Sequence, residues 1–232
     1  MVNKKTKKIF AFIFARGGSK RIKNKNLRKL NGKSLIERKI NFSKKINIFD
    51  EIFLSSDSQK ILNIGKKNNI NLINRPKKIS KDSSPETLAW KHAIKVANKF
   101  SESYTMVVLP CTSPLTIRSD IKKCLSEFDK NKADLVTTIA ESERSPYYNM
   151  VYKTKNNRVK IFSNKFNATN RKKIPKIYNL ANSVYVTSPK YVLKNQFLYK
   201  GKIISVLIPQ ERFLDIDSAI DLKIANFLTR KL

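Results

Sequence analysis

Short apolar runs alternate along the chain with longer segments in which apolar residues recur at the spacing of a helix face. Runs of bulky apolar residues bounded by polar or glycine-containing turns are typical of buried strands. The strands that we expect cover residues 10–14, 51–55, 70–73, 105–109, 134–139, 182–187 and 202–208, and the helices cover residues 35–46, 61–67, 87–100, 119–130 and 219–228. This alternation predicts an α/β fold with a mostly parallel sheet, whose functional site lies at the carboxyl edge of the strands.

Residues 141–182 do not follow this alternation and are rich in lysine, with prolines and tyrosines between the lysines. We interpret them as an extended excursion from the main sheet, because no internal repeat and no low-complexity linker divides the 232 residues. A chain of this length is long enough for one α/β domain with a full core, which we place at residues 1–232.

The composition is that of a folded protein without a membrane span. Apolar residues make up 41% of the chain, and no apolar run approaches the ~20 residues that cross a bilayer. The N-terminus is basic and then apolar, as in a signal peptide, but Arg16 interrupts the apolar run and no cleavage site follows, so we expect a short tail instead. Cys111 and Cys124 lack the spacing of metal ligands, which favours reduced thiols and a cytoplasmic location.

The chain carries 49 Lys and Arg residues against 17 Asp and Glu residues, which gives a net charge of +32. Such a basic protein could bind nucleic acid through its phosphates. However, the lysines are spread over the whole length, and the sequence contains no recognised nucleic-acid-binding module. We therefore favour a bias in overall composition, with some general attraction to polyanions, over a specific nucleic-acid partner.

The first predicted strand ends in a glycine turn, residues 15–20 (ARGGSK), and further cations follow at Arg21, Lys23 and Lys25. The two glycines let the backbone turn tightly and direct several N–H groups into one hollow, and the nearby cations suit a phosphate. The pattern is neither the G-x-G-x-x-G motif nor the P-loop. On spacing alone, a surface loop of a lysine-rich protein is an equal alternative.

The same residues, with their spacing, resemble the signature of a known enzyme family. Residues 15–20 (ARGGSK) and 25–27 (KNL) are similar to the A-R-G-G-S-K and K-N-L segments of the acylneuraminate (CMP-sialic acid synthetase-like) cytidylyltransferases. The resemblance implies a three-layer, Rossmann-like nucleotidyltransferase fold, in which Arg16 and Lys25 clamp the phosphates of CTP and Asn26 helps to select the nucleotide. The nucleotide-binding residues expected in this segment are Ala15, Arg16, Gly17, Gly18, Ser19, Lys25 and Asn26.

Other segments resemble the family in the same order along nearly the whole chain. In the family, the arginine of an R-P turn and a later hydroxyl residue help to bind CTP. Arg75 matches the arginine, and Ser84 is the nearest substitute for the hydroxyl, because Glu86 stands at its usual position. Without the resemblance, the serines here would cap the helix at residues 87–100. Residues 110–115 (PCTSPL) are similar to the family's L-Q-P-T-S-P-L, with Pro110 where many members have a glutamine that contacts the sugar.

By the same resemblance, the excursion forms the sugar side of the cleft and much of a dimer contact. Arg171 falls where the family has the arginine of an R-Q-D run, close to the acid group of the sugar, and it joins Arg16, Lys25 and Asp217 as an expected catalytic residue. The two residues after Arg171 are lysines rather than Gln and Asp, so the local contacts differ. Taken alone, one arginine in a basic loop would be solvated.

Two carboxylates near the C-terminus form the candidate metal site. In an extended segment, Asp215 and Asp217 project to the same side, where they could share a hard cation such as Mg²⁺. The alternative is that Asp217 or Ser218 caps the helix at residues 219–228. The family's D-I-D, with another Asp four residues on, matches Asp215, Asp217 and Asp221 and implies Mg²⁺ as the cofactor.

Together these matches predict a cytidylyltransferase that converts CTP and a nonulosonic (sialic-acid-like) sugar into a CMP-sugar and pyrophosphate, for surface glycan synthesis. The resemblance implies that the anomeric hydroxyl of the sugar attacks the α-phosphorus, and no residue stands out as a general base. The alternatives are a 3-deoxy-manno-octulosonate cytidylyltransferase, against which the pair Lys25-Asn26 argues, and a basic nucleic-acid-binding protein. We expect a cytoplasmic homodimer that is not inserted into a membrane.

Overall fold

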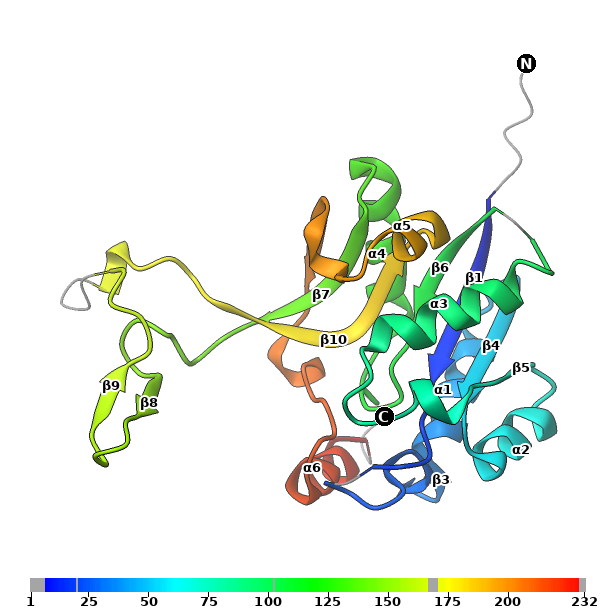
Figure 1. The fold of residues 1–232 in the computed structure, drawn as a ribbon, viewed down its shortest axis with the longest axis horizontal. Helices are drawn as coiled ribbons and strands as arrows, with labels where there is room; N and C mark the ends of the chain where they lie inside the picture. Colours follow the sequence, from blue (N-terminus) through cyan, green and yellow to red (C-terminus); the bar gives the residue numbers. More distant parts are fainter. Residues whose placement is uncertain (1–6, 20, 102, 167–170, 230–232) are drawn as a thin grey trace.

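The computed structural model describes residues 7–19, 21–101, 103–166 and 171–229, with the backbone alone at position 171 (Figure 1). Its main element is a seven-stranded sheet in the order β11-β7-β10-β6-β1-β4-β5. The strands are β1 (Lys8–Phe14), β4 (Glu51–Ser56), β5 (Asn71–Asn74), β6 (Tyr104–Val108), β7 (Leu135–Glu141), β10 (Tyr178–Thr187) and β11 (Ile203–Leu207). Strand β10 runs antiparallel to both β6 and β7, and the other neighbours are parallel. The mostly parallel sheet expected from the sequence is confirmed.

Helices cover both faces of the sheet and complete three layers (Figure 1). One face carries α3 (Glu86–Ala97) and α5 (Pro189–Lys194), and the other carries α1 (Leu35–Lys45), α2 (Gln59–Lys67) and α4 (Arg118–Asn131). The last helix, α6 (Ala219–Thr229), packs against a short hairpin of β2 (Lys29–Leu30) and β3 (Lys33–Ser34). The expected three-layer α/β architecture is therefore present.

Strand β1 lies inside the sheet and is buried on both faces. Four consecutive side chains, at residues 10–13, are fully buried, which explains why this strand is a continuous apolar run rather than an alternating one. Because successive residues face opposite sides, Phe10 and Phe12 pack with Phe53 under α3, whereas Ala11 and Ile13 face α4 and α1. The end of β1 is thereby fixed, and the glycine turn begins from a rigid position.

Helix α5 and the start of β10 differ from the expectations. The apolar pattern does not indicate α5, because a helix of six residues is too short to show a period; Ser188 caps it and Pro189 occupies its first position. Strand β10 begins at Tyr178 and not at residue 182. A bulge interrupts its register between Leu180 and Tyr185, where Asn182 has a positive φ of 48°, and this irregularity hides the first half of the strand in the sequence.

Residues 142–177 leave the sheet between β7 and β10, and Figure 1 shows this excursion projecting away from the main body. It contains a separate antiparallel hairpin of β8 (Val151–Lys153) and β9 (Val159–Ile161). Several of its large apolar side chains are exposed, namely Met150, Val151, Tyr152, Val159 and Phe162. An apolar surface on a projecting arm is typical of a contact with another chain.

Two expectations drawn from composition can be compared with the structure. Within the described ranges, no helix combines the length and the apolar character that a membrane span needs. Cys111 and Cys124 are both buried, and both are free thiols.

Candidate active site

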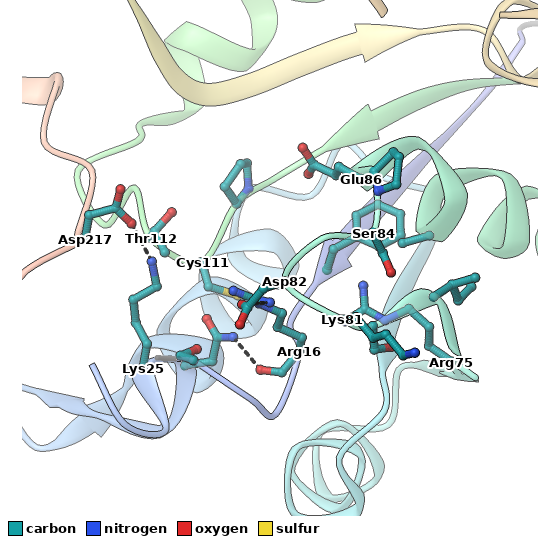
Figure 2. Close-up of a pocket in the computed structure, with 18 of the residues that line it drawn as sticks. Arg16, Lys25, Arg75, Lys81, Asp82, Ser84, Glu86, Cys111, Thr112 and Asp217 are labelled. Atoms are coloured by element: carbon teal, nitrogen blue, oxygen red, sulfur yellow. Dashed lines mark hydrogen bonds and ion pairs between the residues drawn. The ribbon is translucent and has the colours of Figure 1, made fainter. Parts of the chain in front are cut away.

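A pocket of about 620 Å³ opens at the carboxyl ends of β1 and β6, the edge at which a parallel sheet is expected to bind its ligands. Its walls come from segments far apart in the sequence: the loop after β1, the turn after β5, the loop before α3, the loop after β6 and the segment before α6. Figure 2 shows side chains from these segments converging on one cavity. The predicted site residues that line it are Arg16, Ser19, Lys25, Asn26, Arg75, Ser84 and Asp217.

The glycine turn shapes one wall of the pocket. The N–H of Gly17 donates a hydrogen bond of 2.9 Å to the carboxylate of Asp57, so this amide is directed at a protein group. A Cβ atom on Gly17 would lie 2.8 Å from the Cβ of Ser58, which explains the need for glycine at this close approach. Ala15, Gly17 and Gly18 are not among the residues that line the cavity. These three predicted nucleotide-binding residues therefore belong to the backbone of the turn and do not form the wall of the cavity.

The two predicted phosphate clamps each face a carboxylate in the pocket. Arg16 forms an ion pair with Asp82. The Nζ atom of Lys25 lies 2.7 Å from Oδ1 of Asp217, and a guanidinium nitrogen of Arg21 lies 3.2 Å from Oδ2 of the same residue. Lys25 is the more enclosed partner, with 18% of its side chain exposed against 51% for Asp217. Partly exposed pairs such as these add little to stability, so a phosphate can replace their carboxylates at small cost.

Asn26 and Arg75 are both buried against the cavity. The side-chain amide of Asn26 donates to the carbonyl oxygen of Arg16 at 3.1 Å, which holds the first clamp in place. The guanidinium of Arg75 lies 3.9 Å from the carboxylate of Asp57, and among the described residues its Nε has no hydrogen-bond partner. Burial lowers the pKa of Arg75, and Asp57 partly opposes this shift. A buried donor that lines a pocket without a partner is suited to an acceptor on a ligand.

Ser84 and Glu86 occupy the wall that leads into α3. The hydroxyl of Ser84 donates to the carbonyl oxygen of Lys78 at 3.4 Å, a long contact that leaves it able to meet a ligand. Glu86 accepts a hydrogen bond of 3.2 Å from the indole N–H of Trp90. Burial raises the pKa of the Glu86 carboxyl, while Trp90 and Arg75 act in the opposite direction. Glu86 therefore places a carboxyl group inside the pocket where the sequence resemblance expects a hydroxyl.

The contacts in the segment before α6 show whether Asp217 caps this helix or faces the pocket. Ser218 caps α6: its hydroxyl accepts from the N–H of Asp221 at 3.4 Å, and the Asp221 carboxylate accepts from the N–H of Ser218 at 2.7 Å. The carboxylate of Asp217 instead faces Lys25 in the pocket. The cap interpretation thus holds for Ser218 and is wrong for Asp217, whose side chain faces the cavity.

The fit of a divalent cation rests on Asp215 and Asp217, which flank the fully buried Ile216. Within the part of the chain that the structure describes, the buried Oδ1 atom of Asp215 has no hydrogen-bond partner. The described residues contain no cluster of three or more His, Cys, Asp or Glu side chains that could hold a metal. Two carboxylates suit Mg²⁺ where substrate phosphates and water supply the other oxygens, so the residues fit this ion as part of a substrate complex.

Arg171 differs from the other predicted catalytic residues. It begins a short 3-10 helix (Arg171–Lys173) in the excursion, and its side chain lies outside the described residues, as does Lys20 of the glycine turn. None of the described residues of the excursion lines the pocket. The assignment of Arg171 to the site therefore stays a prediction.

Among the charged residues of the site, the sequence does not predict Asp57, Asp82 and Glu86 as site residues. Asp57 directly follows β4, at the same edge of the sheet as the glycine turn, and this position is the signal that could have identified it. Asp82 and Glu86 lie in a stretch whose serines and acids also describe an ordinary helix start. Their partners, Arg16 and Arg75, come from other strands, so only the folded chain reveals them.

Comparisons with known proteins agree with one another. A family model described as "Cytidylyltransferase" matches residues 10–226. The pseudaminic acid cytidylyltransferase of Campylobacter jejuni is 31% identical over 223 residues, which cover 95% of this chain and 96% of the relative. The CMP-N,N'-diacetyllegionaminic acid synthase of the same species is 30% identical over 223 residues, which cover 95% of this chain and 94% of that one.

A solved structure has a similar fold. It is that of CMP:2-keto-3-deoxy-manno-octonic acid synthetase complexed with CTP, with a TM-score of 0.71 and 15% sequence identity. The superposition covers 97% of this chain and 100% of that chain. At this identity, the likeness concerns the fold alone.

Proposed function

The chain belongs to the cytidylyltransferase family and is a nucleotidyltransferase, and on this premise we propose that it transfers CMP from CTP to a nonulosonic acid. The products are the CMP-sugar and pyrophosphate. The family resemblance drawn from the glycine turn is thereby confirmed. The observation that carries the proposal is the pocket itself, in which Arg16, Lys25 and Arg75 face one cavity opposite Asp217.

The nonulosonic class of sugar is supported by the relatives at 30% and 31% identity, which are named for legionaminic and pseudaminic acid. The octulosonate alternative has weaker support, because the corresponding synthetase shares 15% identity and thus only the fold. Pro110 lines the pocket in this chain. Since proline has no side-chain donor, the sugar contact there is apolar, which fits a sugar that differs from N-acetylneuraminate.

The chemistry assigned to the pocket is an in-line displacement at the α-phosphorus of CTP. The anomeric oxygen of the sugar forms the new bond to phosphorus, the bond to the bridging oxygen of the β-phosphate breaks, and the hydroxyl proton passes to solvent. Arg16 and Lys25 bind and orient the phosphates, so that charge on the leaving pyrophosphate is stabilised by fixed donors. Asp215 and Asp217 would hold Mg²⁺, which supplies charge neutralisation between the carboxylates and the phosphate oxygens when it is bound.

The nucleotide itself would be held by groups already in place around the turn. Asn26 keeps one carbonyl acceptor after its amide has bonded to Arg16, and Arg75 keeps a buried donor. Ser84 lies on the same wall of the cavity. A set of fixed donors and acceptors of this kind discriminates between bases, because a wrong base leaves buried groups without partners.

A homodimer is the second part of the proposal. The excursion exposes apolar side chains, with Val159 and Phe162 exposed by 65% and 63%, and the described part of it does not reach the pocket of its own chain. Packing the excursion against a second copy would cover this surface, and the family resemblance implies that Arg171 then lies close to the acid group of the sugar. We also place the enzyme in the cytoplasm, since both cysteines are reduced and buried.

The test is a pyrophosphate-release assay with CTP and Mg²⁺ against pseudaminic acid, N,N'-diacetyllegionaminic acid, N-acetylneuraminic acid and 3-deoxy-manno-octulosonate. We expect release with at least one of the first three acids and with CTP in preference to UTP, GTP and ATP. Reactions without sugar serve as the control for CTP hydrolysis. Release with octulosonate alone, or with no acid of the panel, would contradict the proposal.

A further inference from the structure

A lysine outside the pocket is buried in the interior of the protein. Lys39 of α1 is 4% exposed, and its Nζ atom donates to the carbonyl oxygen of Ser113 at 2.9 Å and to the hydroxyl of Thr116 at 3.2 Å. Both acceptors belong to residues 109–117, the loop between β6 and α4. The hydroxyl of Thr116 in turn donates to the carbonyl oxygen of Ser113 at 2.9 Å, so the loop closes around the ammonium group.

The charge of Lys39 is not balanced by an acid. No carboxylate of the described residues forms an ion pair with it, and the groups that face it are the thiol of Cys111, the guanidinium of Arg38 and the ring of Phe42, whose centroid lies 5.3 Å from Nζ. Burial lowers the pKa of Lys39 to about 8. Burial also raises the pKa of Cys111 to about 12, so the thiol is neutral near pH 7. An ammonium without a carboxylate destabilises the fold, so its position calls for another reason.

The loop that Lys39 holds is also bonded to the proposed metal ligands. The N–H of Ile216, which lies between Asp215 and Asp217, donates to the carbonyl oxygen of Thr112 at 2.8 Å. Because Ile216 is also fully buried, this hydrogen bond fixes the position of residues 215–217 relative to the loop after β6. Thr112 lines the pocket and is the residue directly before Ser113, the acceptor of Lys39.

We propose that Lys39 is a positioning residue: it fixes the loop at residues 109–117 and, through the hydrogen bond that Ile216 donates to Thr112, the placement of Asp215 and Asp217. This inference rests on the proposed function, in which those two carboxylates act on the CTP complex. Lys39 does not line the active-site pocket and is not a catalytic residue. Its effect on the reaction is carried by two consecutive backbone carbonyls, those of Thr112 and Ser113.

The first test compares Lys39→Met with a matched control on the same helix. Lys44→Met removes a lysine whose exposed Nζ donates to the carbonyl oxygen of Asn68 and not to the loop. We expect Lys39→Met to lower kcat about tenfold or more, since small misplacements of reacting groups are costly, and to change KM for CTP by less than about threefold. The half-saturating Mg²⁺ concentration should rise, and Lys44→Met should match the unmodified enzyme in all three values.

The second test does not require turnover. Mn²⁺ is titrated by electron paramagnetic resonance in the presence of CTP and without sugar. Lys39→Met should bind Mn²⁺ several-fold more weakly, whereas Lys44→Met should bind it as the unmodified protein does. Equal Mn²⁺ affinity in the Lys39 variant would overturn the proposal, whatever its turnover.

The third test is chemical rescue, which the structure permits because a cavity of about 210 Å³, lined by Lys39, Arg38, Phe42, Cys111 and Pro114 among others, opens onto this lysine. Lys39→Ala should be slow, and added propylammonium should restore much of its kcat. Tetramethylammonium, which has the charge but no N–H donor, should not. Propylammonium without effect on a folded Lys39→Ala protein would count against the positioning role.

The outcomes separate this inference from the proposed function. If the unmodified protein shows no CTP-dependent pyrophosphate release with the nonulosonic acids, then the proposed function fails. If the unmodified protein is active and Lys39→Met retains its kcat and its Mg²⁺ dependence, then the positioning role fails and the proposed function stands.

Discussion

The Nζ atom of Lys25 lies 2.7 Å from a carboxylate oxygen of Asp217, and the two residues come from opposite ends of the chain. Lys25 belongs to the short helix after the glycine turn, and Asp217 directly precedes the cap of α6. The predicted phosphate clamp and the predicted metal ligand are thus neighbours in the pocket. This contact makes both residues testable with single substitutions.

Removing the Lys25 ammonium should slow the enzyme strongly. We expect Lys25→Ala to reduce kcat about a hundredfold or more, because one preorganised donor to the transition-state charge is worth on the order of 3 kcal/mol. Lys23→Ala removes an exposed lysine two residues away and is the matched control. Steady-state kinetics and thermal midpoints of both variants check the prediction, and a folded Lys25→Ala enzyme with a near-normal rate would disprove the role.

Removing the charge of Asp217 should abolish most activity while the fold survives. Asp217→Asn keeps the shape of the side chain, and α6 keeps its own cap, Ser218 with Asp221. We expect the residual rate to require a higher Mg²⁺ concentration. Ser218→Ala provides the contrast: it should cost about 1 kcal/mol of stability and leave the Mg²⁺ requirement unchanged. Retained turnover and unaltered Mg²⁺ dependence in Asp217→Asn would assign its carboxylate a structural role.

In the proposed CTP complex, Asp82 would compete with the triphosphate for Arg16. Because the two side chains are about one-third exposed, their ion pair is worth less than about 1 kcal/mol, so Asp82→Asn should lower KM for CTP by up to about fivefold. Raised salt should shrink the difference between the two proteins, since salt screens the pair. An unchanged or increased KM for CTP in Asp82→Asn would show that Asp82 does not oppose binding.

The excursion should control the oligomeric state. Phe162→Asp places a charge on the apolar surface of the excursion, and light scattering should then report a monomer with little activity. Ile220→Asp is the control, because Ile220 on α6 is 60% exposed, as Phe162 is 63% exposed, but lies outside the excursion. A dimeric and active Phe162→Asp protein would show that the subunit contact does not involve this surface of the excursion.

The buried charge of Lys39 predicts how stability changes with pH. Its pKa falls from 10.5 in the unfolded chain to about 8 in the fold, so between these values the unfolded chain holds a proton that the folded protein has released. The free energy of unfolding contributed by Lys39 therefore rises with pH across this window, by up to about 1.4 kcal/mol per pH unit, and is lowest below pH 8.

Thermal or urea unfolding of the unmodified protein and of Lys39→Met between pH 7 and pH 10 checks this sign. The unmodified protein should gain stability relative to the variant as the pH rises, because other lysines titrate equally in both. A constant difference over this range would mean that the ammonium of Lys39 is not buried as described.

The sequence predicts the sheet well because inner strands such as β1 and β6 are buried on both faces and appear as unbroken apolar runs. It also predicts Arg16, Lys25 and Asp217, which line the pocket, because their motifs resemble those of the family. It does not predict their carboxylate partners. The pairing of Arg16 with Asp82 and the hydrogen bond from Gly17 to Asp57 join different loops, and such pairings depend on the path of the folded chain.

The burial of Lys39 is likewise not predictable from the sequence. In the sequence, it is one of many lysines on an amphipathic helix and has no feature that separates it from Lys44 or Lys45. Its burial arises because the loop after β6 closes over α1, a contact between residues 74 positions apart. Similarly, the start of β10 cannot be recognised in the sequence. The bulge at Asn182, which has a positive φ, interrupts the alternation of side chains that would identify a strand.

The carboxylates that face Arg16 and Lys25 also affect which anions this very basic protein accepts. With a net charge of +32, the surface draws in polyanions of every kind, but the two clamps already carry counterions supplied by the protein. An anion from solution binds at these positions only if it interacts with Arg16 and Lys25 more favourably than Asp82 and Asp217 do. A triphosphate that arrives with its own divalent cation would have this advantage, because the cation could pair with the carboxylate of Asp217 while Lys25 pairs with the phosphate. The pocket is thus insulated from the electrostatic attraction of the surface around it.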